Sequence, residues 1–408
     1  MQLEQHWKFM TQVENYKHIL ENIFKQEIKF SNNKIENNCI GALKNINDFS
    51  VFSNNFIARL KRLNNHFSNS NEHITEIIHT AKQIGQTTGY KWAGAYSELV
   101  ALDYWIQFDN LSNINFPDRG DVNTFADSIA KQIGQQEIDL DISLDLTTKK
   151  IYTDVKCLIP THTELTDQIL NRVKSKTKNQ DYLIGIDNLF DIDYLRTKAD
   201  FVSELQSGNL ITELEKCVNQ NTTFYSHTLK SGSTASFRIS YAQPGKNTIL
   251  STIREMEPYK LAINYKYKIL DYYNKLLINE PSLITFVINP WFNQELNISI
   301  GEFFSTFLRS LSRRVFIELT NDDTDMGTIF PELVGQNLKI SDVAKKITGI
   351  IFIKDNSIKQ SGEDVNDVYI YLNPNSTNKV LTRSDFDILN WTPKIKQPFI
   401  DDFYYDNY

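Results

Sequence analysis

The chain has 408 residues, of which 41% are hydrophobic and 12% aromatic, and its formal net charge is −7. This length and composition predict a folded globular protein with enough apolar material for two or three domains. The acidic balance argues against tight autonomous binding of nucleic acid, because Lys and Arg contacts to phosphate dominate such binding, but it leaves room for local basic patches.

The cysteines and the apolar segments narrow the cellular setting. Cys39, Cys157 and Cys217 lack the C-x-x-C spacing of a structural zinc site or a disulfide framework, so a reducing interior is expected. The N-terminus lacks the charged and then apolar start of a secretion signal, and no apolar run approaches the roughly 18 residues of a membrane span. We therefore expect a cytoplasmic protein with no membrane partner.

Residues 1–70 are predicted to form an N-terminal helical region. An Asn-rich stretch at 31–38 interrupts it as a loop. Apolar residues recur at helical spacing before this loop, at Val13, Tyr16, Ile19, Leu20 and Ile23. Two interpretations of the basic sequence from Arg59 to Arg62 stay open, a solvated helix face or an edge that contacts phosphate.

Residues 71–160 are expected to form the first part of a core. A long helical segment is predicted at 72–107, either continuous or interrupted near 85–89. Within it, Glu98 lies beside an apolar stripe that would pack beneath a sheet. The stripe consists of Leu99, Leu102, Trp105 and Ile106. The following segment, 109–136, is rich in loops and has a turn at 117–120.

Residues 137–156 contain two segments that alternate polar with apolar residues, Glu-Ile-Asp-Leu-Asp-Ile-Ser-Leu and Lys-Ile-Tyr-Thr-Asp-Val-Lys. A short polar turn joins them, which predicts a β-hairpin. Asp139 and Asp141 share one face of the first strand. On the second strand, Asp154 and Lys156 share a face. Carboxylates so close together repel unless a hard cation lies among them, and Mg²⁺ is held by one or two carboxylates plus substrate phosphate.

Residues 161–245 are predicted to be an insertion into the core or a substrate-binding subdomain. The predicted elements are helices at 163–176 and 201–218 and strands at 182–186, 223–229 and 235–241. The first helix carries Arg172, Lys174 and Lys176, the best candidate in the chain for a nucleic-acid-binding patch. A solvated helix face explains these residues equally well.

Residues 246–320 are expected to form the second part of the core. A helix at 248–279 interleaves tyrosines with lysines that include Lys266 and Lys268. Such interleaving suits a nucleic-acid surface, on which rings stack on bases and ammonium groups meet phosphates, although tyrosines at helical spacing also suit core packing. The remaining predicted elements are a buried strand at 283–288 and a helix at 303–316.

Residues 321–408 are predicted to be a C-terminal α/β extension. It contains strand patterns at 347–354 and 368–372, which predict either a hairpin or extra edge strands. Its aromatic, acidic tail at 399–408 is expected to be a surface or interaction segment. The chain has no H-E-x-x-H, no G-x-x-x-x-G-K-[S/T] and no G-x-S-x-G sequence. Any energy, activation or target selection would therefore have to come from a partner protein.

The set of Glu98, Asp141 and Asp154-Val155-Lys156 resembles the PD-(D/E)XK superfamily of restriction-endonuclease-like nucleases. These proteins combine a helical Glu, an acidic residue on one strand and a D/E-x-K on the next. Asp141 lies thirteen residues before Asp154, a more usual spacing than that of Asp139, so Asp141 is the favoured strand ligand. No Pro precedes it. The motifs cover residues 75–160, and a looser likeness extends to 246–289.

The resemblance implies an α/β fold with a restriction-endonuclease-like core, that is, a central mixed sheet flanked by helices, with an N-terminal helical region and an inserted subdomain. Asp141, Asp154 and the carbonyl of Val155 would ligate Mg²⁺, for which Mn²⁺ would substitute. Glu98 would ligate a metal directly or through a water. Lys156 would orient or deprotonate the attacking water and stabilise the charge on phosphorus.

The implied activity is metal-dependent hydrolysis of phosphodiester bonds, as a DNA endonuclease in restriction or anti-phage defence, with RNA as an open alternative substrate. The family's habit of dimerising to cut both strands makes a homodimer a further expectation. The alternative is a non-catalytic adaptor or subunit of a defence complex that retains the nuclease fold. The acidic charge favours the alternative, whereas the complete set of four polar residues favours the enzyme.

Overall fold

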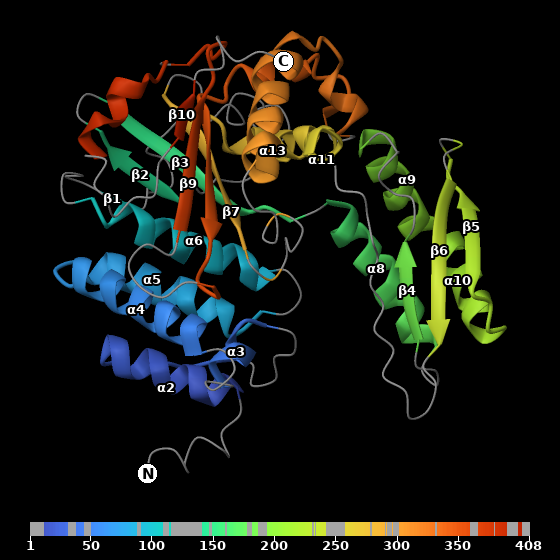
Figure 1. Ribbon diagram of the computed structural model, residues 1–408, viewed down its shortest axis with the longest axis horizontal. Helices are drawn as coiled ribbons and strands as arrows, with labels where there is room; N and C mark the ends of the chain where they lie inside the picture. Colours follow the sequence, from blue (N-terminus) through green and yellow to red (C-terminus); the bar gives the residue numbers. More distant parts are fainter. Residues whose placement is uncertain are drawn as a thin grey trace.

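The computed structural model contains a large α/β unit and a smaller unit beside it (Figure 1). It describes residues 12–31, 38–44, 50–87, 91–108, 114–115, 141–146, 149–159, 161–177, 182–186, 194–230, 232, 234–241, 258–277, 280–289, 291, 296, 302–330, 333–359, 366–378, 380–389 and 399–401. Asp139 and the predicted turn at 117–120 lie outside these residues.

The large unit is built on a seven-stranded sheet in the order β1-β2-β3-β7-β8-β9-β10. The strands are β1 (Ile114–Asn115), β2 (Ile142–Asp145), β3 (Lys150–Cys157), β7 (Ser282–Ile288), β8 (Gly349–Asp355), β9 (Asn366–Leu372) and β10 (Phe399–Asp401). The central strands β3, β7 and β8 are parallel, whereas β2 pairs antiparallel with β3, and β9 with β8. Every residue of β7 and β8 is buried, because the central strands are covered on both faces.

One face of the sheet is covered by the N-terminal helices (Figure 1). These are α2 (Gln12–Phe24), α3 (Ile40–Lys44), α4 (Ser50–His66), α5 (Asn71–Ile84) and α6 (Lys91–Trp105). Helix α6 lies against the sheet, and α4 and α5 cover its other side. It is therefore apolar almost all round, as expected of a helix between two layers. From the sheet, Val155, Val287 and Ile351 belong to the same core.

The opposite face packs against a second helical layer. Its elements are α11 (Pro258–Lys266), the 3-10 helix η2 (Tyr267–Lys275), α13 (Glu302–Arg313), the π-helical turn η3 (Arg314–Glu318), the short 3-10 turns η4 (Leu319–Asn321) and η5 (Met326–Thr328), and α14 (Ile340–Ala344). Ile284, Phe286 and Ile350 project from the sheet into this layer. The predicted α/β class, a mixed sheet flanked by helices, is thus confirmed.

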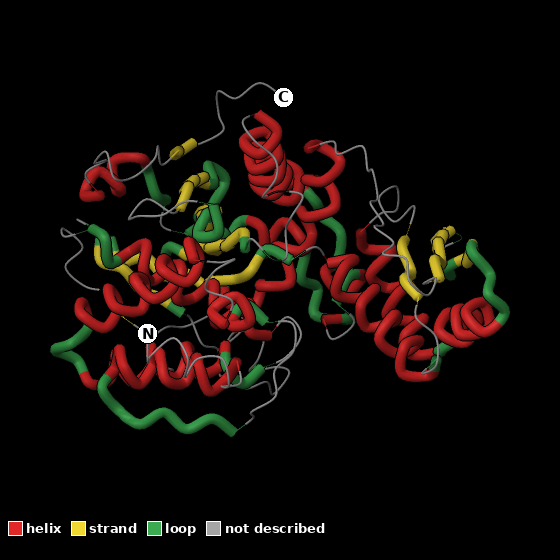
Figure 2. The backbone as a smooth tube through the Cα atoms, turned by 60° about the horizontal axis from the view of Figure 1, so that its bottom comes forward, coloured by secondary structure: helices red, strands yellow, loops and turns green. Residues whose placement is uncertain are grey.

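The residues predicted to form an insertion build a unit with its own core (Figure 2). It consists of α8 (Thr161–Lys176), β4 (Tyr182–Ile186), α9 (Tyr194–Ser207), α10 (Asn209–Asn219), β5 (Phe224–Thr228) and β6 (Thr234–Tyr241). Its antiparallel sheet has the order β4-β6-β5. The single helix predicted at 201–218 is wrong: Gly208, at φ 72°, has a left-handed conformation that divides it into α9 and α10.

The C-terminal segment is part of the main sheet. Strands β8 and β9 pair antiparallel, as in the hairpin that was one of the two predictions, whereas β8 lies between β7 and β9 and is therefore not an edge strand. The 3-10 helix η7 (Arg383–Leu389) follows, and β10 pairs in parallel with β9. These last three described residues therefore form the outermost strand of the sheet on this side, within the tail that was predicted to be a surface or interaction segment.

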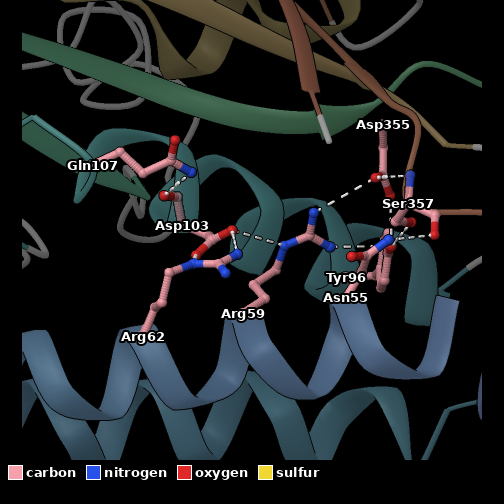
Figure 3. Close-up of polar contacts among 8 residues, drawn as sticks. All are labelled: Asn55, Arg59, Arg62, Tyr96, Asp103, Gln107, Asp355 and Ser357. Atoms are coloured by element: carbon pink, nitrogen blue, oxygen red, sulfur yellow. Dashed lines mark hydrogen bonds and ion pairs between the residues drawn. The ribbon is translucent and has the colours of Figure 1, made fainter. Parts of the chain in front are cut away.

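A buried ion-pair network joins the N-terminal helices to this C-terminal strand (Figure 3). The Arg59 side chain is 0% exposed; its Nε lies 3.2 Å from Asp103 Oδ2 on α6, and its Nη2 lies 3.5 Å from Asp355 Oδ1 at the end of β8. Arg62 donates from Nε and Nη2 to the same Asp103, over 2.8 and 2.7 Å. Both interpretations of the basic sequence were therefore wrong for Arg59, whose charge is neutralised inside the protein.

Hydroxyl and amide groups complete the network (Figure 3). Tyr96 on α6 accepts a hydrogen bond from Arg59 Nη1 over 3.2 Å and donates to Asp355 Oδ2 over 2.5 Å. Asn55 on α4 donates to the carbonyl of Ser357 over 2.8 Å. Helix α6 is consequently held from both sides by groups that are far apart in the sequence.

Candidate active site

The hairpin of β2 and β3 brings the acidic residues and Lys156 together. Ile142 pairs with Thr153, so Asp141, directly before β2, lies beside Asp154 of β3. Asp154 and Lys156 are two residues apart on one strand and project from the same face. The predicted hairpin is confirmed over its described part, β2 and β3.

Lys156 lies between the two carboxylates. Its Nζ donates to Asp154 Oδ1 over 2.8 Å and lies 3.7 Å from Asp141 Oδ2. Burial favours the neutral amine, but the charges of Asp154 and Asp141 outweigh it and raise the pKa of Lys156 above its usual value. Lys156 therefore remains an ammonium group, which suits stabilisation of negative charge and orientation of a water better than removal of a proton.

The backbone of Val155 lies beside these carboxylates. Its N–H donates to Asp141 Oδ2 over 2.6 Å, so this edge of β3 faces the segment that carries Asp141. The N–H and the C=O of a residue in an extended strand point to the same edge, so the carbonyl of Val155 points that way too. The predicted oxygen ligands of Asp141, Asp154 and Val155 thus occupy one stretch of the hairpin.

Glu98 reaches the same site from α6. Burial and the negative charges of Asp141 and Asp154 together raise the pKa of its carboxyl to about 8, against the lowering effects of Lys156 and of a hydrogen bond with Thr80. Since all three groups of the hairpin act on Glu98, the structure brings together the four residues that the sequence singled out.

Asp154 is the most enclosed of the acids. Its side chain is 1% exposed, and burial and the charge of Asp141 raise its pKa to about 7. Its Oδ2 is buried and has no hydrogen-bond partner within the described part of the chain. An unsatisfied buried carboxylate oxygen is costly, by roughly 1–3 kcal/mol or more, so this atom is suited to an additional ligand such as a cation.

The donor set fits a hard divalent cation. Within the described ranges, no group of three or more His, Cys, Asp or Glu side chains is arranged as a metal site. Mg²⁺, however, is commonly bound by only one or two carboxylates together with water and substrate phosphate. Asp141 and Asp154 supply that number, and the unpartnered Asp154 Oδ2 is the observation that favours an ion at this point.

Three further residues at the site were not predicted. Thr80 on α5 forms the hydrogen bond with Glu98. From η2, the ring centroid of Tyr272 lies 5.8 Å from Lys156 Nζ, and the charge of Lys275 acts on Asp154. The interleaved tyrosines and lysines were the signal for η2, whereas nothing in the sequence around Thr80 indicated a role.

The predicted nucleic-acid-binding residues have different surroundings. Arg172, Lys174 and Lys176 are exposed on α8, where Arg172 donates to the carbonyl of Leu205 over 2.6 Å and Lys176 Nζ lies 3.6 Å from Glu215 Oε2.

The two lysines predicted from the Tyr-Lys pattern are more enclosed. Lys266 Nζ donates to Glu318 Oε2 over 2.9 Å with only 15% of its side chain exposed, and Lys268 is buried. The charge of Lys266 is therefore already paired within the fold, which leaves it poorly placed for a phosphate.

No family model, curated protein or solved structure matches this chain. The interpretation of the site therefore depends on its residues and geometry. None of the helices in the described ranges has the length and apolar character needed to cross a membrane.

Proposed function

We propose that this protein is a Mg²⁺-dependent phosphodiesterase with a restriction-endonuclease-like core, acting as an endonuclease on DNA. The observation that carries the proposal is the convergence of Glu98, Asp141, Asp154 and Lys156, with Asp154 Oδ2 buried and without a hydrogen-bond partner among the described residues. The antiparallel β2–β3 hairpin, the parallel strand β7 beside it and α6 beneath it support this type of core.

Each group has a role that its surroundings favour. Asp141, Asp154 and the carbonyl of Val155 would hold the cation, which supplies Lewis acidity and a more acidic bound water. Lys156, as an ammonium group, stabilises the charge that develops on the phosphoryl oxygens and orients the attacking water. Glu98, with its raised pKa, accepts or holds a proton near neutral pH on the helix side of the site.

The biological setting that we propose is restriction or anti-phage defence, with DNA as substrate and a homodimer as the form that cuts both strands. RNA is the alternative substrate. A partner protein would supply activation or target selection.

A non-catalytic subunit with the same fold is the second candidate. It is favoured by the net charge of −7 and by the enclosure of Lys266 and Lys268, which leave little basic surface in this region. A subunit without activity has no need for the buried carboxylate oxygen of Asp154 that lacks a partner in the described ranges, which is why we favour the enzyme.

Incubation of the protein with plasmid DNA and with a long RNA tests the proposal. Each substrate is treated with Mg²⁺, with Mn²⁺ and with EDTA, and the products are separated on gels. We expect metal-dependent cleavage that Asp154→Ala and Lys156→Ala both abolish. Lys216→Ala, at an exposed residue of α10, is the matched control and should cleave normally.

Circular dichroism and thermal melting show that each variant is folded. Cleavage that persists in Asp154→Ala and Lys156→Ala would refute this site. Binding of nucleic acid without cleavage under any metal condition would favour the non-catalytic subunit.

A further inference from the structure

The segment η2 packs against the face of β3 that carries Asp154 and Lys156. Its Tyr272 ring lies 5.8 Å from Lys156 Nζ and 5.8 Å from the ring of Phe286 on the neighbouring strand β7. Leu277, two residues beyond η2, is buried together with Tyr152 of β3. The segment is therefore fixed to β3 at two points.

These two contacts determine what lies between them. Tyr152, Asp154 and Lys156 follow one another on one face of β3. Tyr152 packs with Leu277, and Lys156 lies near Tyr272. The segment from 272 to 277 therefore runs antiparallel to β3.

Between Tyr272 and Leu277 in the sequence, Lys275 is the charged residue, and Asp154 is the residue between Tyr152 and Lys156 on the same face of β3. Lys275 is only partly buried. Its positive charge lowers the pKa of Asp154, which agrees with this placement, although burial and Asp141 act more strongly in the other direction.

We propose that Lys275 is a second phosphate-binding residue of this site, which acts with Lys156 to bind the phosphate backbone of a nucleic-acid substrate. The inference rests on the proposed function and names two cations, one from β3 and one from η2, that both act on the most buried carboxylate. The ammonium group of the partly exposed Lys275 side chain is a compact point charge, which suits a phosphate.

The charges at the site add a condition to this binding. Three carboxyl groups, those of Glu98, Asp141 and Asp154, lie near the two ammonium groups of Lys156 and Lys275 and offset their positive charge. A bound divalent cation would add two positive charges to this site. Substrate binding through Lys275 is therefore expected to be strong with metal and weak without it.

Fluorescence anisotropy of a labelled DNA duplex and of a labelled single-stranded RNA tests this inference. Binding is measured with Mg²⁺ and with EDTA in the Lys156→Ala protein, which should not cleave, and in Lys156→Ala carrying Lys275→Ala, Lys275→Gln or Lys275→Arg. Lys275→Ala and Lys275→Gln are expected to weaken Mg²⁺-dependent binding roughly tenfold. On the duplex, they should also make the negative slope of log K against log salt shallower by about 0.9. Lys275→Arg should retain the slope, and Lys216→Ala should change neither quantity.

The cleavage assay separates this inference from the proposed function. In the otherwise natural protein, Lys275→Gln is expected to raise KM for plasmid more than it lowers kcat. Unchanged binding and an unchanged salt slope in both Lys275→Ala and Lys275→Gln would overturn the role of Lys275, even if the natural protein cleaves DNA. Lys275-dependent binding without any cleavage would support the role and refute the hydrolase, and no binding at all would refute both.

Discussion

Replacing Arg59 with methionine removes the cation at the centre of the buried network while retaining most of the volume of the side chain. Asp103 and Asp355 would then lose an ion pair at sites where the side chains of Arg59 and Asp103 are 0% exposed. Removal of one partner from a buried pair leaves an uncompensated charge and destabilises a protein by about 3–5 kcal/mol. We expect a loss of this size.

Arg62→Met is the matched control. Arg62 forms two hydrogen bonds with Asp103, but its side chain is 28% exposed, and Arg59 would still neutralise Asp103. Hydrogen bonds to charged groups contribute about 1.5–3 kcal/mol, and partial exposure to solvent lowers this value. The loss in Arg62→Met should therefore be clearly smaller than that in Arg59→Met.

Urea unfolding followed by tryptophan fluorescence measures both variants. The sequence of the small unit, 161–241, contains no tryptophan, whereas Trp92 and Trp105 are buried on α6 beside the network. The fluorescence transition therefore reports on the large unit, and its midpoint and slope give the change in the free energy of unfolding. A loss below about 1 kcal/mol in Arg59→Met, or an equal loss in Arg62→Met, would refute this account of the network.

Three other predictions concern the site and the small unit. The pKa values of Glu98 and Asp154 are about 8 and about 7 in the folded protein, against 4.5 and 3.8 ordinarily, so the metal-free folded state holds protons that the unfolded chain has released. The melting temperature in EDTA should therefore fall as the pH rises from about 4 to 8, and Mg²⁺ should reduce this fall. A melting temperature that rises over this range would contradict the raised pKa values. Thr80→Val removes the hydrogen bond with Glu98, so the Mg²⁺ concentration needed for half-maximal cleavage should rise roughly tenfold, and an unchanged value would show that Thr80 does not position Glu98. Gly208→Ala places a side chain at φ 72° and should destabilise the small unit by about 1–2 kcal/mol in circular dichroism melts, whereas Gly185→Ala, at ordinary φ with open space around it, should not, and equal effects would count against this explanation.

The parts of the fold that local pattern determines were predictable. The alternation in β2 and β3 and the apolar run of β7 identified these strands, because side-chain direction in a strand follows directly from sequence position. The break at Gly208 was missed, because a helix can continue through a glycine and the sequence does not give the positive φ that ends the helix here.

Features that depend on distant residues could not be predicted in this way. The basic residue Arg59 was expected at the surface, since its partners Asp103 and Asp355 lie 44 and 296 positions further along the chain. The central position of β8 depends in the same way on pairing with β7. At the site, Glu98, Asp141, Asp154 and Lys156 were found through a family pattern, whereas Lys275 came to light only through the packing of η2 on β3.

The parallel pairing of β3 with β7 has a consequence for how the protein is made. The two strands are separated by more than a hundred residues, and the whole small unit lies between them in the sequence. During synthesis, β3 emerges from the ribosome long before β7 can pair with it, so an unprotected strand edge bearing apolar residues persists meanwhile. A fragment that ends before residue 280 is therefore expected to aggregate when expressed, and a fragment that stays monomeric by size-exclusion chromatography would show that other contacts shield this edge.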